Sequence, residues 1–244
     1  MTRGMIQVAD IRNVSIHGSG SASGGVYKKM AIRGEGTILD DVECEQFKIF
    51  GSSDVMGNMK LNKFHIFGES SVKGQVDVEE LKIFGTLSIG GDAQAHRAKV
   101  RGTLDIDCGL HGERADIKGM ITTGGDLEVE SLSLQGAFEV NGVMNAGSID
   151  AGLRFGMSKA DEIVGGKIKI KKKSNFPIFS FGKEEGRLES RMIEGDDIYL
   201  ENTSAEVVRG KNIKIGTGCK IGLVEYSGHF EHKSNSVVKE NKKI

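Results

Sequence analysis

The chain has little of what marks several common classes of protein. Its 244 residues include no tryptophan, one proline and three cysteines, and 33 basic and 34 acidic side chains leave a net charge of −1. An odd number of irregularly spaced cysteines does not make a disulfide framework. A charge near zero gives no general tendency to bind nucleic acid. Because neither a signal peptide nor a run of 18 apolar residues is found, we expect a cytoplasmic protein.

Motifs for cofactors are also missing. The chain has no Gly-x-x-x-x-Gly-Lys-Ser/Thr sequence, so nothing indicates nucleotide binding. His229 and His232 lie three residues apart without a clear third ligand, which does not indicate a metal site. We therefore expect no cofactor.

Glycine, in contrast, is abundant and regularly placed. Seven of the 35 glycines recur at every 17th position without an insertion: Gly34, Gly51, Gly68, Gly85, Gly102, Gly119 and Gly136. A short fixed period is the signature of a solenoid, in which each repeat stacks on its neighbours. We call these seven residues the ladder glycines.

Each 17-residue repeat contains three pairs of inward residues, and one outward residue separates the members of each pair. Val42/Cys44 and Phe47/Ile49 are examples. Such alternation is typical of a strand with one buried face. The pattern predicts an all-β triangular solenoid, a β-helix of 17-residue coils with three short strands and three corners per coil.

The corners of the coil have their own pattern. The ladder glycines form one corner, and a second glycine follows six residues later in five coils. We expect both glycine corners to use the positive φ that sharp turns need. The remaining corner is polar in every coil, as at Gln46 and Lys63.

The repeat predicts one elongated domain. Residues 1–13 form an N-terminal leader, and residues 14–230 form a single β-helical domain with an irregular insertion near 171–187. Residues 231–244 are rich in Lys, Glu, Ser and Asn, so we expect a disordered charged tail.

The insertion is the most unusual surface. Three lysines precede three phenylalanines in it: Lys171, Lys172, Lys173, Phe176, Phe179 and Phe181. Cations beside apolar anchors suit an anionic membrane surface or a partner protein. The alternative is that the phenylalanines fold back over the side or end of the rod.

Catalysis has weak support. Asp105 and Asp107 point outward together, as paired carboxylates do in sugar-cleaving enzymes. The matching positions of the neighbouring coils hold no acid, histidine or arginine that would extend the patch. We therefore expect a solvated face and a protein that is not an enzyme.

The ends of the solenoid predict self-association. A terminal coil presents unpaired N–H and C=O groups, which form a template for strand addition. The apolar residues expected near the two ends are Val14, Ile16, Ile221, Val224, Tyr226 and Phe230. We expect these residues to form a polymer interface.

Three consecutive coils carry a motif of the form apolar-x-apolar-x-Gly. They read Phe47-Lys-Ile-Phe-Gly51, Phe64-His-Ile-Phe-Gly68 and Leu81-Lys-Ile-Phe-Gly85. With its 17-residue coil the chain resembles the bactofilins, which are polymer-forming bacterial cytoskeletal proteins. Similarity is strongest from about 30 to 150 and weaker from 193 to 226.

The resemblance implies a right-handed β-helix that assembles without nucleotide into non-polar filaments through its ends. It implies self-association, including co-polymers with a paralogue, and contact with the inner face of the cell membrane and with cell-wall or envelope proteins. The processes it implies are cell shape, cell-wall synthesis and surface appendages, including motility. The alternative is a β-helical carbohydrate-binding or carbohydrate-active protein.

Overall fold

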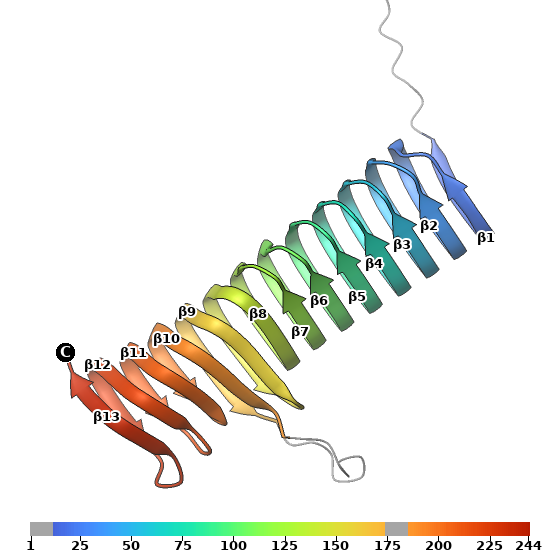
Figure 1. Ribbon diagram of the computed structural model, residues 1–244. Helices are drawn as coiled ribbons and strands as arrows, with labels where there is room; N and C mark the ends of the chain where they lie inside the picture. Colours follow the sequence, from blue (N-terminus) through green and yellow to red (C-terminus); the bar gives the residue numbers. More distant parts are fainter. Residues whose placement is uncertain (1–11, 174–184) are drawn as a thin grey trace, which may run out of the picture.

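The computed structural model describes residues 12–173 and 185–244, and these form an all-β solenoid without a helix. Thirteen strands pair in chain order, each in parallel with the strands before and after it. The coils stack in one row, with β1 and β13 at opposite ends (Figure 1). The parallel β-helix expected from the glycine period is confirmed.

The strands have the following bounds. They are β1 (Asn13–Ala22), β2 (Gly25–Ile38), β3 (Val42–Val55), β4 (Met59–Val72), β5 (Val76–Ile89), β6 (Ala93–Ile106), β7 (Leu110–Thr123), β8 (Leu127–Leu153), β9 (Met157–Lys172), β10 (Arg187–Leu200), β11 (Thr203–Ile215), β12 (Lys220–His232) and β13 (Val237–Lys243).

The regular half of the rod, β2 to β8, keeps one register. Each residue pairs with the residue 17 positions later, as Ile49 does with Ile66. The inward residues are buried, and the rings of Phe47 and Phe64 stack with centroids 5.5 Å apart. Burying each such side chain stabilises the fold by roughly 1.5–3 kcal/mol. The core is therefore a set of columns parallel to the rod axis.

Each regular coil from β2 to β7 contains one strand of 14 residues, where the sequence pattern predicted three short ones. In β3 the backbone pairing continues through the polar corner and through Gly51, and it stops only at the third corner. Neighbouring coils bend at equivalent positions of the repeat, so the N–H and C=O groups of one coil stay aligned with those of the next around each bend.

The ladder glycines are required for two reasons. Gly51 has a φ of +128°, which L side chains rarely adopt, and a Cβ there would lie 2.1 Å from the carbonyl oxygen of Gly34. The glycine that follows six residues after the ladder glycine was expected to have a positive φ as well, and that prediction was wrong. Gly57 lies outside the left-handed region, but a Cβ there would lie 2.4 Å from Oδ1 of Asp41.

That close contact belongs to a side-chain ladder at the third corner. The backbone N–H of Asn58 donates to Oδ1 of Asp41 at 2.6 Å, and the N–H of Gln75 donates to Oδ1 of Asn58 at 2.9 Å. The second glycine leaves room for these bonds. Side chains thus satisfy backbone donors where strand pairing is interrupted.

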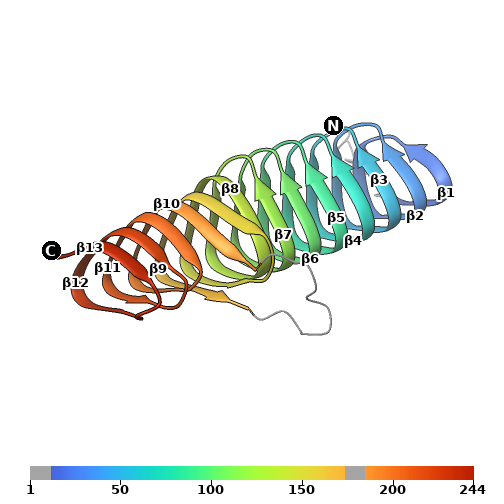
Figure 2. The same cartoon turned by 60° about the horizontal axis from the view of Figure 1, so that its bottom comes forward.

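The C-terminal half, β9 to β13, continues in the same row (Figure 2), but the spacing of paired residues varies from strand to strand. Paired residues of β10 and β11 are 15 positions apart in the chain, as Leu188↔Thr203 and Ile198↔Ile213 show. Between β9 and β10 the offset is 30 positions, as Ile168↔Ile198 shows, so the chain makes an excursion there and returns to the same columns. Residues 174–184 of the predicted insertion lie outside the described residues.

The predicted domain bounds need correction at both ends. Asn13 already belongs to β1, and residues 1–11 lie outside the described residues. The predicted disordered tail was wrong, because β12 extends to His232 and β13 pairs with it in parallel. Composition was misleading here, since the lysines and glutamate of β13 point outward on a strand whose Val238 packs against the core.

Candidate functional site

The N-terminal end of the rod is formed by β1. Val14 pairs with Met30 and Ile16 with Ile32, so both predicted interface residues lie on the first described coil. Ile16 is 8% exposed, whereas Ile32 is 1% exposed. The columns of inward residues that contain Val14 and Ile16 thus reach the end of the rod. Among the described strands, β1 pairs with β2 alone.

At the C-terminal end the predicted residues divide into two groups. Ile221 and Val224 lie beneath β13 and are 1% and 0% exposed, so their assignment to the end surface was wrong. Tyr226 and Phe230 are partly buried, with ring centroids 5.4 Å apart. The outermost coil consists of the last part of β12, with Phe230, and of β13.

Both ends leave backbone groups open. Strand β13 pairs with β12 only from Lys220 to Tyr226, and no described strand pairs with the outer side of β13 or of residues 227–232. The outer edge of β1 is equally unpaired among the residues described. The rod therefore ends in two strand edges that a further strand can extend.

Two of the three lysines at the start of the predicted insertion, Lys171 and Lys172, have side-chain partners within the rod. Nζ of Lys171 lies 5.2 Å from the centroid of the Tyr199 ring, and Nζ of Lys172 lies 2.6 Å from Oε1 of Glu185. The bond to Lys172 lowers the pKa of Glu185. These lysines end β9, where Lys173 donates its backbone N–H to Leu153. Their charges are thus less available to a membrane than the sequence indicated, and Phe176, Phe179 and Phe181 lie outside the described residues.

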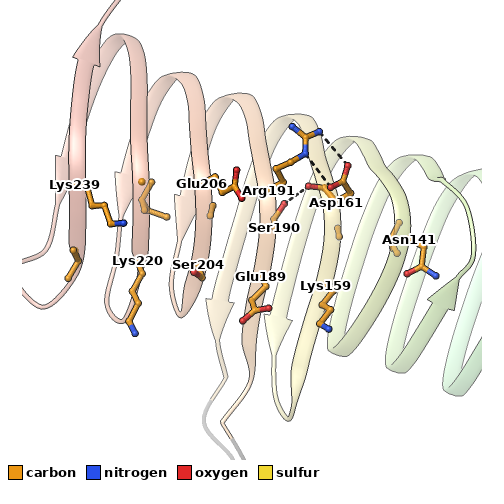
Figure 3. A pocket seen from close by; sticks show the side chains of 16 residues that line it. Asn141, Lys159, Asp161, Glu189, Ser190, Arg191, Ser204, Glu206, Lys220 and Lys239 are labelled. Atoms are coloured by element: carbon orange, nitrogen blue, oxygen red, sulfur yellow. Dashed lines mark hydrogen bonds and ion pairs between the residues drawn. The ribbon is translucent and has the colours of Figure 1, made fainter.

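A groove of about 1030 Å³ runs along the C-terminal half, from the middle of β8 to β13 (Figure 3). Ala160, Ser190 and Ala205 lie at successive positions of one column in it. These residues are smaller than Val140 before them and Ile221 after them, so this column has its smallest side chains in the middle of the groove.

Charged residues of both signs form the rim of the groove. Figure 3 shows Lys159, Glu189, Ser204 and Lys220 on successive coils, with Arg191 turned toward Asp161. Nε of Arg191 lies 3.3 Å from Oδ1 of Asp161, and this pairing raises the pKa of Arg191. None of the described residues that line the groove is a histidine or cysteine. Such a surface suits binding of a partner that carries charges of both signs.

The other sequence candidates do not assemble into a site. Asp105 and Asp107 lie on the regular half, and His229 and His232 lie on the last coil. Within the described parts of the chain, no group of three or more His, Cys, Asp and Glu side chains is placed to hold a metal ion.

One surface feature was missed from the sequence. Phe50, Phe67 and Phe84 are 41%, 42% and 42% exposed, and they form a column of parallel rings on β3, β4 and β5. The signal was present, because a phenylalanine precedes the ladder glycine in three consecutive coils. An apolar residue at an outward position, repeated at the coil period, forms a stripe on the rod.

Comparison with known proteins gives two curated relatives. The chain is 53% identical over 234 residues to the protein YhbE of Bacillus subtilis (strain 168), a match that covers 96% of this chain and 99% of that one. It is 43% identical over 103 residues to YhbF of the same organism, which covers 42% of each chain. Both relatives are described as uncharacterized proteins.

No family model matches the chain, and no solved structure matches it. The similarity to YhbE is high and extends over nearly the whole of both chains. The chain therefore belongs to the family of YhbE from Bacillus subtilis.

Proposed function

We propose that the protein is a bactofilin-like cytoskeletal scaffold of the bacterial cytoplasm. It assembles into filaments through the ends of its β-helix, without nucleotide and without enzymatic activity. In this function it positions partners that act in cell shape, cell-wall synthesis or surface appendages such as those of motility.

The observation that supports this proposal most directly is the state of the two ends. Each end is a strand edge with an apolar column behind it, Ile16 at one end and Phe230 at the other. The described residues form no helix that could cover either edge. Natural proteins often cover such edges with a helix or loop, and two edges that no described strand or helix covers favour assembly.

The geometry of a solenoid fits an end-to-end polymer. Each coil satisfies its backbone groups through the coils above and below, so a second rod that docks on the edge continues a pattern already repeated along the chain. The sides of the rod stay free for other partners, including envelope proteins and the inner face of the membrane. The similarity to both YhbE and YhbF favours co-polymers of related chains, because chains of similar sequence would present similar coils to one another.

The proposal is tested by placing a charge on each end separately and then together. Ile16→Asp alters the N-terminal column, Phe230→Asp alters the C-terminal column, and Met56→Asp is a control at an exposed apolar residue of the regular half. Assembly is followed by sedimentation and negative-stain microscopy without nucleotide. We expect filaments from the wild type and the control, and single rods from the double variant.

The single variants distinguish the polarity of the filament. In a non-polar filament each end contacts its own kind, so either single variant yields pairs of rods joined at the unaltered end. In a polar filament each end contacts the opposite one, and either single variant yields single rods. Filaments that persist in the double variant would place the contacts elsewhere and overturn the proposal.

The carbohydrate alternative has weaker support. Sugars stack on the faces of aromatic rings, but Phe50, Phe67 and Phe84 cover one another's facing sides at centroid distances of 5.0 and 5.1 Å. Proteins that bind polysaccharide through stacking need free ring faces. The edges that remain here suit an apolar partner instead.

A further inference from the structure

One face of the regular half combines the phenylalanine column with a column of cations. We define this aromatic–basic face as the outward residues between the polar corner and the ladder glycine on β2 to β6. Its members are Ala31, Arg33, Lys48, Phe50, His65, Phe67, Lys82, Phe84, Lys99 and Arg101. None of them is a carboxylate.

The three rings form one continuous apolar stripe. Phe50 and Phe67 lie at an interplanar angle of 3°, and Phe67 and Phe84 at 1°. The guanidinium of Arg33 lies over the outer face of Phe50, 5.7 Å from its centroid. The rings therefore present their edges to solvent, which is unusual for large apolar side chains that have no partner.

The charge around the stripe is positive. Within the face, Arg33 and Arg101 occupy the two ends of the phenylalanine column, and Lys48, Lys82 and Lys99 occupy the neighbouring column. Two acids border the face. Oε1 of Glu80 lies 2.8 Å from Nζ of Lys82, and Oδ2 of Asp116 lies 2.7 Å from Nη2 of Arg101.

The net charge of the face remains positive after these two pairs are counted. Glu35 and Glu69 lie beyond the ladder glycines and outside the face. The stripe therefore has cations at both ends and along one side, and the ladder glycines along the other.

This combination selects among the surfaces that can cover the stripe. A second copy of the same face would bring lysine columns together, which is unfavourable because like charges repel. A sugar polymer would find little stacking surface, because both faces of Phe67 and one face each of Phe50 and Phe84 are covered by a neighbouring ring. An anionic bilayer offers an apolar interior for the ring edges and phosphate groups for the lysines and arginines.

We propose that the aromatic–basic face docks on an anionic phospholipid membrane, with Phe50, Phe67 and Phe84 inserted among the lipids. The three rings lie on a line parallel to the rod axis, so the rod lies flat on the bilayer. The inference rests on the proposed scaffold function for its cellular setting. The contact itself needs no polymer, because all three rings belong to consecutive coils of one chain.

Flotation with lipid vesicles tests this contact. The full chain, as wild type and as the double end variant Ile16→Asp with Phe230→Asp, is mixed with vesicles of equal parts phosphatidylcholine and phosphatidylglycerol at about 0.15 M salt. Vesicles of phosphatidylcholine alone serve as the uncharged comparison. We expect both proteins to float with the anionic vesicles only, so failure of polymer formation and failure of membrane binding are measured separately.

Three further variants identify the surface. Replacing Phe50, Phe67 and Phe84 together by threonine, which keeps a high strand propensity, should lower vesicle binding by at least about tenfold. Lys48→Gln with Lys99→Gln should lower it by about fivefold per lysine. The matched control replaces Leu39, Met56 and Phe155, three exposed apolar residues outside the face, by threonine and should bind as the wild type does.

Several outcomes overturn the inference. They are equal binding by the wild type and the phenylalanine variant at matched thermal stability, binding to uncharged vesicles as strong as to anionic ones, or no flotation at all. If the phenylalanine variant instead changes the sedimentation of the protein without vesicles, the face is a contact between copies of this chain.

Discussion

The two halves of the rod share one core and differ in their corners. In the regular half the inward residues Val42, Cys44, Phe47 and Ile49 precede a glycine corner with positive φ, and equivalent residues of successive coils are 17 positions apart. Between β10 and β11 this spacing is 15 positions, and Gly165, Gly195 and Gly210 lie in one column without positive φ. The inward columns, with Ile168, Ile198 and Ile213, nevertheless remain buried.

The comparison separates two roles of the sequence. Alternating inward residues determine that the chain forms a β-helix, because each one must pack on its equivalent in the next coil. The corners determine how many residues a coil uses. A solenoid can therefore change its coil length without interrupting its core, and the hollowed groove lies in the half that has made this change.

The largest expected effect comes from a charge in the shared core. Ile66 is 0% exposed between Ile49 and Ile83, so Ile66→Asp should lower the free energy of unfolding by more than about 4 kcal/mol. Each coil contacts only its neighbours, so hydrogen exchange should show lost protection around β4 and retained protection in β10 to β12.

Lys60→Asp is the control for this change, because its outward side chain lies between Met59 and Leu61 on the same strand. It should leave thermal stability nearly unchanged. Equal loss of protection in both halves after Ile66→Asp would show that the two halves unfold as one unit.

The glycine columns of the two halves give the next largest effect. A Cβ at Gly85 would lie 2.0 Å from the carbonyl oxygen of Gly68, and one at Gly195 would lie 2.2 Å from that of Gly165. Gly85 also has a φ of +138°, so Gly85→Ala should cost about 1–2 kcal/mol more than Gly195→Ala. Urea unfolding of both variants measures the difference.

Gly18 supplies the control for the contact with the neighbouring coil. It has a φ of +80°, but a Cβ there would have no atom within 4 Å. Gly18→Ala should therefore be the mildest of the three glycine variants. A cost as large as that of Gly85→Ala would mean that backbone conformation outweighs the close approach of the coils.

Acid should weaken the regular half through Glu80. Its carboxylate accepts a hydrogen bond from Lys82 and lies 2.9 Å from Nε2 of His65, and these contacts lower its pKa from 4.5 to about 2, with the Lys82 bond as the largest cause. Because the folded pKa is depressed, this contribution to stability is present above pH 4.5 and is lost as the pH falls toward 2.

Glu80→Gln should therefore flatten the dependence of unfolding stability on pH in that range. Urea midpoints measured across it provide the check, with Glu79→Gln, at an exposed neighbouring position, as the control. An unchanged slope in Glu80→Gln would contradict the assignment.

The smallest effect belongs to the C-terminal half at high pH. The hydroxyl of Tyr199 donates to Glu201, and this bond is the main cause that raises the pKa of Tyr199 from 10 to about 12. The contribution is complete below pH 10 and is lost as the pH rises through about 12. Tyr199→Phe should remove this alkaline dependence, which thermal unfolding followed by circular dichroism can measure.

Much of the regular half follows from sequence because strand alternation fixes which side chains point inward. The inward positions of Ile49 and Ile66 can be assigned from the amino-acid pattern alone, and so can the first coil with Val14 and Ile16. The 15-residue coils cannot, because only β10 and β11 keep that spacing and the excursion before β10 hides it.

The remaining surprises share a physical cause, which is that composition does not show which residues lie side by side. The last strand reads as a charged tail, yet Val238 pairs with Ile221. The contact between Glu80 and His65 joins residues 15 positions apart on neighbouring coils. The phenylalanine stripe likewise forms only once coils are stacked in register.

The ladder glycines also bear on how such a gene changes over time. Each lies against the backbone of the equivalent residue in the preceding coil, so the contact between neighbouring coils is the same throughout the regular half. Duplicating or deleting the codons for one whole coil would reproduce that contact, whereas the gain or loss of a single residue within the alternating part of a strand would turn inward side chains outward. Rods of this family should therefore lengthen and shorten by whole coils, with both ends inherited unchanged.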